Sequence, residues 1–376
     1  MFSAVVLVVA VALHLYLWHR LVYVTTRPRG LGRRAGTVAI GVLGAGMVAA
    51  LLIRGEFVVF AWSSYIWLAV MFYLVVALLV LEVPRLAVRL WLRRRPNVDE
   101  DRRLLLARSA AIVAGLAAVG TTGYGVSSAL GAPVVERVPI ALRRLGRPLD
   151  GYRIALISDV HLGPILGRAH TERLVRTIND LRPDLVAITG DLADGSVEDL
   201  GRGGEPLRDL RSTHGTFFVT GNHEYYTGDL PNWLSALRGW GVNPLLNDRA
   251  EITRGAAAFD LAGVNDPTGQ WYDDAPDFTR ALGDRDPARP VVLLSHQPVQ
   301  VRDSAKLGVD LQLSGHTHGG QMCPFNLLVP LQQPAVAGRF RFGDTQLYVT
   351  RGAGFWGPPV RVAAAPEITL VELRSA

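Results

Sequence analysis

The chain after residue 150 contains five short clusters of side chains that commonly bind divalent metal ions. Imidazole and carboxylate groups suit ions such as manganese, iron and zinc. Five of the seven histidines after residue 150 lie in these clusters, whereas His170 and His214 do not. Cys323 is the only cysteine, so the sequence excludes an internal disulfide and a cysteine-based zinc site. In chain order the clusters are Asp159-Val160-His161, Gly190-Asp191, Gly221-Asn222-His223-Glu224, His296-Gln297-Pro298 and Gly315-His316-Thr317-His318-Gly319-Gly320.

The spacing within the clusters predicts that they share metal ions. Asp159 and His161 come from one loop and can hold the same ion. His316 and His318, two apart on an extended segment, project from the same side and could serve neighbouring ions. The carboxylate of Asp191 can bridge two cations. Each cluster alone is explained equally well by turn-forming residues or by a histidine bonded to the backbone, but five such coincidences in one fold require a common cause.

Each cluster follows a short apolar run that is typical of a β-strand. Residues 168–181, an amphipathic stretch ended by Pro183, are predicted to form a helix after the first run. Open α/β sheets bind ligands at the carboxyl ends of their strands, so the five clusters are expected to meet at such an edge. The apolar runs cover residues 152–158, 184–189, 216–220, 290–295 and 309–314.

The complete ordered set of clusters is similar to the calcineurin-like metallophosphoesterase superfamily. The resemblance covers about residues 150–376, and the order Asp-x-His, Gly-Asp, Gly-Asn-His-Glu, His, Gly-His-x-His is that of the family. With apolar segments ahead of the clusters, the chain looks most like the bacterial branch of membrane-anchored phosphohydrolases. It also resembles transmembrane proteins with a metallophosphoesterase domain. The fold implied for residues 151–376 is an α/β sandwich of four layers, α/β/β/α, in which two mixed sheets lie between helices.

The resemblance implies two divalent metal ions, manganese, iron or zinc, and a role for each cluster. It makes Asp191 the bridging ligand. It makes His223 a residue that contacts the phosphate and protonates the leaving oxygen as a general acid, so His223 and Asp191 are the expected catalytic residues. The two ions would activate a bridging water, whose hydroxide attacks the phosphorus in line. The implied metal ligands are Asp159, His161, Asp191 and His318 for one ion, and Asp191, Asn222, His296 and His316 for the other.

Other residues near the clusters are expected to have structural roles. Glu224 is expected to bond its own loop, Asp194 to be a solvated loop carboxylate, and Cys323 to be a small buried residue. Two apolar loops follow the last clusters; packing explains them more simply than contact with a lipid substrate, which is the alternative. These loops contain Phe325, Leu327, Leu328 and Val329, and Phe355, Trp356, Pro358 and Pro359.

Residues 1–130 are predicted to form a membrane domain with four transmembrane helices, because four segments approach the roughly 20 apolar residues that a membrane-spanning helix needs. His14 and His19 are expected near the membrane interface rather than in a functional site. Residues 131–150 are expected to be a linker. The four segments cover about residues 2–18, 35–53, 57–81 and 109–130.

The charge distribution predicts the orientation in the cell membrane. Residues 1–150 contain 18 arginines against seven acidic residues, a net charge of +11, whereas the rest of the chain has a net charge of −5. The arginines gather in the loops after the first and third segments, as they do in cytoplasmic loops. The catalytic part is therefore expected on the extracytoplasmic side. Arg102-Arg103 resembles a twin-arginine export signal, although an ordinary positive flank is the simpler interpretation.

These features favour a multi-pass, membrane-anchored phosphohydrolase that cleaves a phosphoester, in a monoester or a diester, or a pyrophosphate. The substrate is expected to contain phosphate, and a lipid or another envelope-associated molecule fits the anchor. Arginines beside apolar runs are membrane flanks, so nucleic-acid binding is disfavoured, and no protein partner is indicated. Two alternatives are a non-catalytic metal-binding scaffold, which predicts missing ligands, and a membrane sensor or transporter, which predicts polar residues inside the helices.

Overall fold

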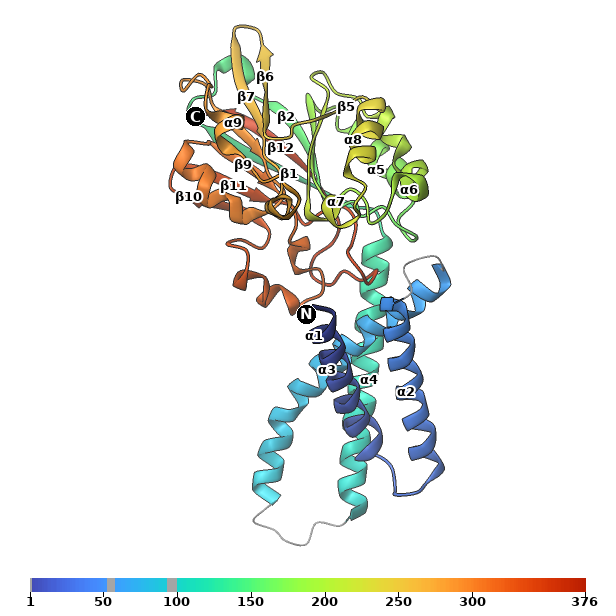
Figure 1. The fold of residues 1–376 in the computed structure, drawn as a ribbon. Helices are drawn as coiled ribbons and strands as arrows, with labels where there is room; N and C mark the ends of the chain where they lie inside the picture. Colours follow the sequence, from blue (N-terminus) through green and yellow to red (C-terminus); the bar gives the residue numbers. More distant parts are fainter. Residues whose placement is uncertain (1, 53–57, 93–99) are drawn as a thin grey trace. The chain divides into compact units, whose positions relative to one another are not determined.

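The computed structural model describes residues 2–52, 58–92 and 100–376. The chain divides into two compact units, one of residues up to 127 together with 357–360, and one of residues 128–356 and 361–376. The first unit is helical and the second contains all of the strands of the described residues (Figure 1).

The first unit consists of long helices in the regions where apolar segments are predicted. Among the described residues, two helical stretches are long and apolar enough to cross a membrane, Trp62–Ala87 and Asp101–Leu130, and Leu7–Tyr23 is a shorter apolar helix. Four membrane spans therefore stay a prediction. The predicted segment ends at residues 53 and 57, and the arginines at 93–95, lie outside the described residues. The helices are α1 (Phe2–Leu17), a single π-helical stretch (Trp18–Tyr23), α2 (Leu31–Leu52), α3 (Val58–Leu92) and α4 (Glu100–Leu130).

His14 is buried within the helical unit, and its expected position near the membrane interface stays a prediction. Only 9% of its surface is exposed. The ring receives a hydrogen bond from the indole N–H of Trp67 at 3.1 Å, and its Nδ1 bonds the carbonyl oxygen of Ala10 at 2.8 Å. A buried imidazole with both nitrogens bonded is satisfied, so His14 joins α1 to α3 structurally.

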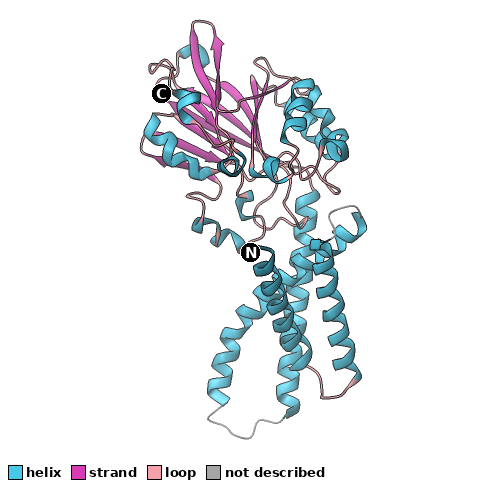
Figure 2. Ribbon diagram, viewed as in Figure 1, coloured by secondary structure: helices cyan, strands magenta, loops and turns pink. Residues whose placement is uncertain are grey.

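The second unit contains two six-stranded mixed sheets (Figure 2). Strands β2, β3, β4 and β5 run parallel in the first sheet, and β7, β8, β9 and β11 run parallel in the second. The first sheet has the order β1 (Val134–Leu142), β12 (Glu367–Ser375), β2 (Tyr152–Ile157), β3 (Leu185–Thr189), β4 (Thr216–Val219), β5 (Val242–Pro244). The second has the order β10 (Gly338–Phe342), β11 (Thr345–Val349), β9 (Leu311–Ser314), β8 (Val291–Leu294), β7 (Ala257–Gly263), β6 (Asp248–Arg254).

The hydrophobic clusters show how the layers are arranged. One cluster lies between the sheets and joins residues such as Leu156 of β2 to Leu261 of β7 and Leu313 of β9. A second lies under α5 and α8 on the outer face of the first sheet, and a third lies under α9 on the outer face of the second. Because both faces of each sheet are covered, the parallel strands are mostly apolar. The short helices are α5 (Arg168–Asp180), α6 (Val197–Gly204), α7 (Asn222–Tyr226), α8 (Leu230–Gly239), α9 (Phe278–Leu282) and α10 (Val301–Ser304).

Residues 134–142 are a strand, although the sequence analysis places them in a linker. Strand β1 pairs in parallel with β12 at the edge of the first sheet. Its last part turns Ile140 and Leu142 into the core between the sheets, where both are at most 2% exposed. The pattern is hard to recognise in sequence because the first half of this edge strand is only partly buried and carries Glu136 and Arg137.

Candidate metal centre

The five predicted clusters meet where strands of both sheets end. Hydrogen bonds join the loops that carry them: the N–H of Asp159 bonds Gly190 O at 3.1 Å, and the N–H of His161 bonds Asp191 O at 3.1 Å. In the second sheet, the N–H of Gly315 bonds His296 O at 3.0 Å. The predicted strands are present within two residues of their expected ends, so the expectation of a shared edge is correct.

Five of the expected metal ligands have a left-handed backbone, with φ between 47° and 71°. Such a conformation is uncommon for residues with a Cβ atom and costs of order 1–3 kcal/mol each, so it accumulates where function requires it. It turns each side chain sharply off its strand toward the common centre. Close packing also demands glycine at position 315, because a Cβ there would lie 1.9 Å from Ser158 Oγ. The five residues are Asp159, His161, Asp191, His316 and His318.

The first group of candidate ligands joins Asp159, His161 and His318. Their ligand atoms lie within 4.8 Å of one another. Nε2 of His318 is 3.1 Å from Nε2 of His161 and 3.3 Å from Oδ1 of Asp159. Oδ2 of Asp191 lies 3.7 Å from His161 Nε2. All four side chains are at most 9% exposed.

The second group joins Asp191, His296 and His316, with Asn222 beside them. Nε2 of His296 is 3.2 Å from each of Asp191 Oδ2, Asn222 Oδ1 and His316 Nδ1. Asp191 is therefore the residue that approaches both groups. These are the partners that the resemblance implies for a bridging carboxylate.

The spacing and the donor set fit a divalent cation. Nitrogen and oxygen ligands lie about 2.0–2.2 Å from an ion such as zinc, so two ligands of one ion are separated by roughly 3–3.5 Å. The Nδ1–H of His296 donates to the carbonyl oxygen of Thr189 at 2.7 Å, which leaves Nε2 with a lone pair in the neutral ring. That lone pair faces the oxygens of Asp191 and Asn222, which are acceptors as well. Either an additional proton or a cation must lie among these atoms.

The charges around the histidines show how strongly the centre attracts positive charge. Burial alone would lower the pKa of His161, but the carboxylate of Asp194 outweighs it, with help from Asp191, and raises the pKa to about 9. The pKa of His296 is raised well above its usual value in the same way, against burial and chiefly by Asp191. The same carboxylates that keep two buried imidazoles protonated would also attract a divalent ion. Binding of that ion would displace the protons.

Asp194 orients two histidines, although the sequence analysis describes it as a solvated loop residue. Its Oδ1 accepts from Nδ1 of His161 at 2.7 Å and from Nδ1 of His223 at 2.8 Å. Burial would raise the pKa of Asp194, but His161 and His223 lower it to about 2. Both donated bonds fix a hydrogen on Nδ1, so Nε2 of His161 is the nitrogen that could bind a metal ion. The side chain is 31% exposed, which explains why a loop carboxylate is the natural interpretation of sequence alone.

Replacing Asp194 with alanine should therefore weaken metal binding indirectly. We expect about a 10–100-fold loss of affinity for manganese or zinc, because partners that orient a metal-binding histidine usually contribute that much. Titration of the metal-free protein with each ion, followed by calorimetry, measures it. Asp180→Ala removes an exposed carboxylate at the end of α5 and is the control. Unchanged affinity in Asp194→Ala would show that His161 is held without this bond.

Glu224 connects the loops of the site through backbone hydrogen bonds, and the expected structural role is correct. Its carboxylate accepts from the N–H of Gly221 at 2.6 Å, Leu192 at 2.7 Å and Asp191 at 2.9 Å. The side chain is 2% exposed, so water cannot replace it. It holds the loop of Asp191 against the start of α7.

The substitution Glu224→Ala should lower stability strongly. It leaves three buried N–H groups without acceptors, and each unsatisfied donor costs about 1–3 kcal/mol. We expect the free energy of unfolding to fall by at least about 3 kcal/mol, measured by thermal unfolding of the metal-free protein. Glu198→Ala, at an exposed position of α6, should leave the melting temperature nearly unchanged. Equal melting temperatures for both variants would contradict the bonding role.

Arg361 is a buried partner of the site that sequence reasoning missed. It is 0% exposed, and its Nη2 donates to Nδ1 of His318 at 3.1 Å. It also donates to the carbonyl oxygens of Gly354 and Arg351. Burial and this guanidinium lower the pKa of His318 well below its usual value, so His318 stays neutral and its ring is fixed. The only sequence hint is an arginine inside an otherwise apolar C-terminal stretch.

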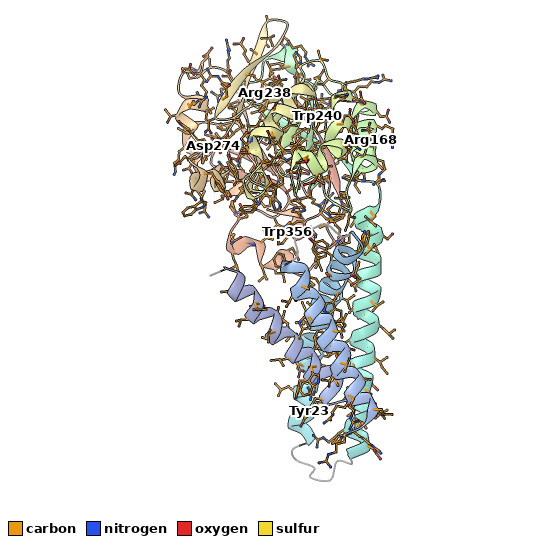
Figure 3. The ribbon with its side chains drawn as sticks, turned by 45° about the vertical axis from the view of Figure 1, so that its right-hand side comes forward. Tyr23, Arg168, Arg238, Trp240, Asp274 and Trp356 are labelled. Carbon is orange, nitrogen blue, oxygen red and sulfur yellow. The ribbon has the colours of Figure 1, made fainter. Side chains whose placement is uncertain are left out.

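The apolar loops near the site do not all pack inward. Phe355 is 5% exposed and packs with Ala129 and Leu166. Trp356, which is labelled in Figure 3, has 58% of its surface exposed, and Phe325, Leu327 and Leu328 are exposed as well. The packing interpretation is therefore correct for Phe355, Pro358 and Pro359, which are buried. Cys323 is half-buried and not fully buried.

Comparison with known proteins gives the same picture over the same residues. The sequence profile described as calcineurin-like phosphoesterase matches residues 152–320. The chain is 37% identical over 262 residues to the transmembrane protein with metallophosphoesterase domain of Danio rerio, covering 67% of this chain and 60% of that protein. It is 36% identical over 292 residues to the protein of that name from Bos taurus, covering 74% of this chain and 65% of that protein.

A bacterial relative is matched over a larger share of its length. The chain is 40% identical over 261 residues to an uncharacterized metallophosphoesterase of Helicobacter pylori, which covers 69% of this chain and 68% of that protein. The chain spans less than two thirds of the length of the two vertebrate relatives. With the clusters gathered at one edge, these matches lead to one conclusion: the chain belongs to the family of calcineurin-like phosphoesterases.

Proposed function

We propose that this protein is a membrane-anchored, metal-dependent hydrolase of phosphoesters or pyrophosphates, with two divalent ions at its centre. One observation carries the proposal: three buried acceptor atoms face one another. Nε2 of His296 lies 3.2 Å from both Asp191 Oδ2 and Asn222 Oδ1. A non-catalytic scaffold does not require such a cluster. Family membership and the two apolar helices support the hydrolase and the anchor.

The residues present fit the two ions that the family implies. Asp191 would be shared between them because it approaches both ligand groups. When bound, the ions would polarise the phosphate and lower the pKa of a water molecule. One ion would be held by Asp159, His161, Asp191 and His318, and the other by Asp191, Asn222, His296 and His316.

His223 is placed to move a proton at the edge of the centre. Its backbone N–H donates to Asp191 Oδ1 at 2.9 Å, and its Nδ1 donates to Asp194 at 2.8 Å. Burial would lower the pKa of His223, but Asp194 and Asp191 raise it, so the imidazolium form is favoured. Its side chain is 16% exposed, whereas those of His161 and His296 are fully buried. Nε2 can therefore give a proton to a leaving oxygen that arrives from solvent.

The activity is tested on the full chain purified in detergent. The protein is stripped with EDTA and reloaded separately with manganese, iron, zinc and cobalt. It is then offered bis-p-nitrophenyl phosphate, p-nitrophenyl phosphate, adenosine diphosphate and a short-chain lipid phosphate. We expect hydrolysis of at least one ester class that returns with metal and is absent in Asp191→Asn. Silence on every substrate with every ion would favour the scaffold.

The proposed orientation places the catalytic part outside the cytoplasm of a multi-pass protein. In a Cys323→Ala background, Trp271→Cys puts a single thiol at a residue that is 78% exposed. A maleimide that cannot cross membranes should label this thiol in intact cells. Labelling only after the membrane is permeabilised would reverse the orientation.

A further inference from the structure

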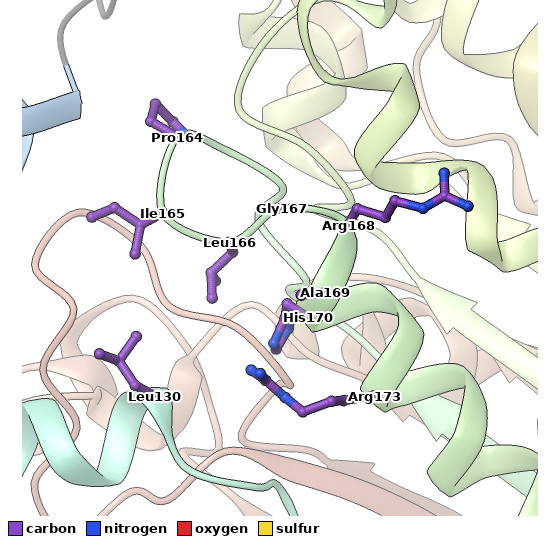
Figure 4. A pocket seen from close by; sticks show the side chains of 9 residues that line it. All are labelled: Leu130, Pro164, Ile165, Leu166, Gly167, Arg168, Ala169, His170 and Arg173. Atoms are coloured by element: carbon purple, nitrogen blue, oxygen red, sulfur yellow. The ribbon is translucent and has the colours of Figure 1, made fainter.

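A pocket lies in the strand-containing unit, lined by residues other than those assigned to the metal centre. Its volume is about 420 Å³. The loop between Gly163 and Gly167, the first two turns of α5 and the last residue of α4 surround it (Figure 4). The lining residues are Leu130, Pro164, Ile165, Leu166, Gly167, Arg168, Ala169, His170 and Arg173.

One wall of the pocket is the N-terminus of a 13-residue helix. The residue before the helix, Gly167, has no side chain that could cap the first turn. The N–H groups of His170 and Thr171 bond Gly167 O, whereas the first N–H groups of a helix have no partner within it. Those of Arg168 and Ala169 therefore contribute partial positive charge to the pocket wall, where an oxyanion binds favourably.

His170 supplies an unsatisfied polar group at the same place. The residue is 6% exposed, and its Nε2 is buried without a hydrogen-bond partner. Burial, together with Arg173 and Arg361, lowers its pKa to about 4, so the ring is neutral near pH 7 and retains one N–H to donate. A buried imidazole nitrogen without a partner is costly. An oxygen atom of a ligand in the pocket would provide the missing partner.

Arg173 adds a full positive charge. Figure 4 shows its guanidinium turned toward the space that also borders His170 and Leu166. Within the described ranges, no ion pair or hydrogen bond is found for this half-buried side chain. Arg168 differs, because its side chain pairs with Glu172 and Glu205 and points away from the pocket. The pocket thus contains an unpaired cation and no carboxylate.

The opposite wall is apolar and includes the end of a candidate membrane span. Leu130 is the last residue of the stretch Asp101–Leu130 and is 37% exposed. Pro164, Ile165 and Leu166 complete this wall. A free inorganic anion would use only the polar side of such a pocket. An amphiphile with an anionic head would use both sides.

We propose that this pocket binds an acidic phospholipid, with the phosphate oxygens at the start of α5 and the acyl part against the apolar wall. The site is independent of the metal centre. It would hold the loop that follows His161 close to the point where α4 ends. A bound phospholipid would also explain why the start of α5, Nε2 of His170 and the side chain of Arg173 all border this pocket.

The test uses the full chain in a non-ionic detergent after EDTA treatment, so that binding at the metal centre is abolished. Native mass spectrometry measures binding of dioctanoyl phosphatidic acid, dioctanoyl phosphatidylcholine and inorganic phosphate. We expect phosphatidic acid to bind without metal and the other two to bind at least about tenfold more weakly. Arg173→Gln should weaken phosphatidic acid binding by about tenfold or more, since it removes a charged hydrogen bond. His170→Phe, which keeps the ring and removes its nitrogens, should also weaken it.

Arg176→Gln is the matched control, because Arg176 lies on the same helix and its side chain is 65% exposed. It should leave lipid binding unchanged. Equal losses in Arg176→Gln and Arg173→Gln would overturn the proposal, as would phosphate or phosphatidylcholine binding as tightly as phosphatidic acid. Binding that disappears with the metal would assign the lipid to the metal centre instead. Arg173→Gln should still hydrolyse a soluble diester at the normal rate, which separates this site from the proposed catalysis.

Discussion

Replacing Asp191 with asparagine is expected to remove most of the bound metal and to abolish turnover. Oδ2 of Asp191 lies 3.2 Å from His296 Nε2 and 3.7 Å from His161 Nε2. An amide in this position loses the negative charge that both ions would share. Its NH2 group could donate to these ring nitrogens and occupy the lone pairs that a metal needs. The loss of metal affinity should exceed the roughly 10–100-fold loss expected for Asp194→Ala, because Asp194 only orients ligands and does not bind the metal.

Two measurements check the expectation for Asp191→Asn. Elemental analysis after buffer exchange should find a clear loss of bound metal, and single-turnover assays should find no product above background. The protein should still fold, because the amide is isosteric with the carboxylate. Asp344→Asn, at a side chain that is 86% exposed, should retain both metal and activity. Full metal content in Asp191→Asn would contradict a bridging role.

Replacing His223 with alanine should also lower turnover but, unlike Asp191→Asn, should leave the bound metal in place. The ring bonds Asp194 through Nδ1 and is not needed as a ligand in the proposed arrangement. Loss of a general acid typically lowers the rate by about 10²–10⁴-fold. The loss should be smaller for substrates with a good leaving group, such as p-nitrophenol, because that oxygen departs without a proton.

The measurement for His223→Ala compares kcat on activated and unactivated esters at equal metal content. Tyr226→Phe is the control, since that ring lies beside His223, with centroids 5.5 Å apart, and is 63% exposed. It should change kcat little. If His223→Ala emptied the site of metal, His223 would be a ligand and the proposed roles would have to be exchanged.

Much of the fold near the site could be predicted from the sequence because it depends on local patterns. The apolar runs before Asp159, Asp191 and His316 are short enough for buried strands, and turn residues follow each of them. The amphipathic period predicts a helix over residues 168–181, and α5 ends one residue earlier, at Asp180. Strand β1 is not predicted, because an edge strand with charged residues in its first half lacks both the apolar run and the regular alternation of a buried strand.

The residues that orient the histidine rings lie far along the chain from the rings they contact. Asp194 bonds His161 across 33 residues, and Arg361 bonds His318 across 43. Neither residue stands beside a motif that would reveal its partner. A lone carboxylate in a loop and a lone arginine in an apolar stretch have many possible roles until the fold brings a ring nitrogen within 3 Å or so of them.

The sequence by itself determined the family, the ordered ligand types and the strands that carry them. These follow from residue chemistry and from the alternation of apolar and turn residues along the chain. Only the tertiary structure decided that Asp194 and Arg361 orient the histidine rings and that His170 and Arg173 line one pocket. Hydrogen bonds and electrostatic contacts act over a few ångströms in space, and folding, rather than sequence spacing, sets those distances.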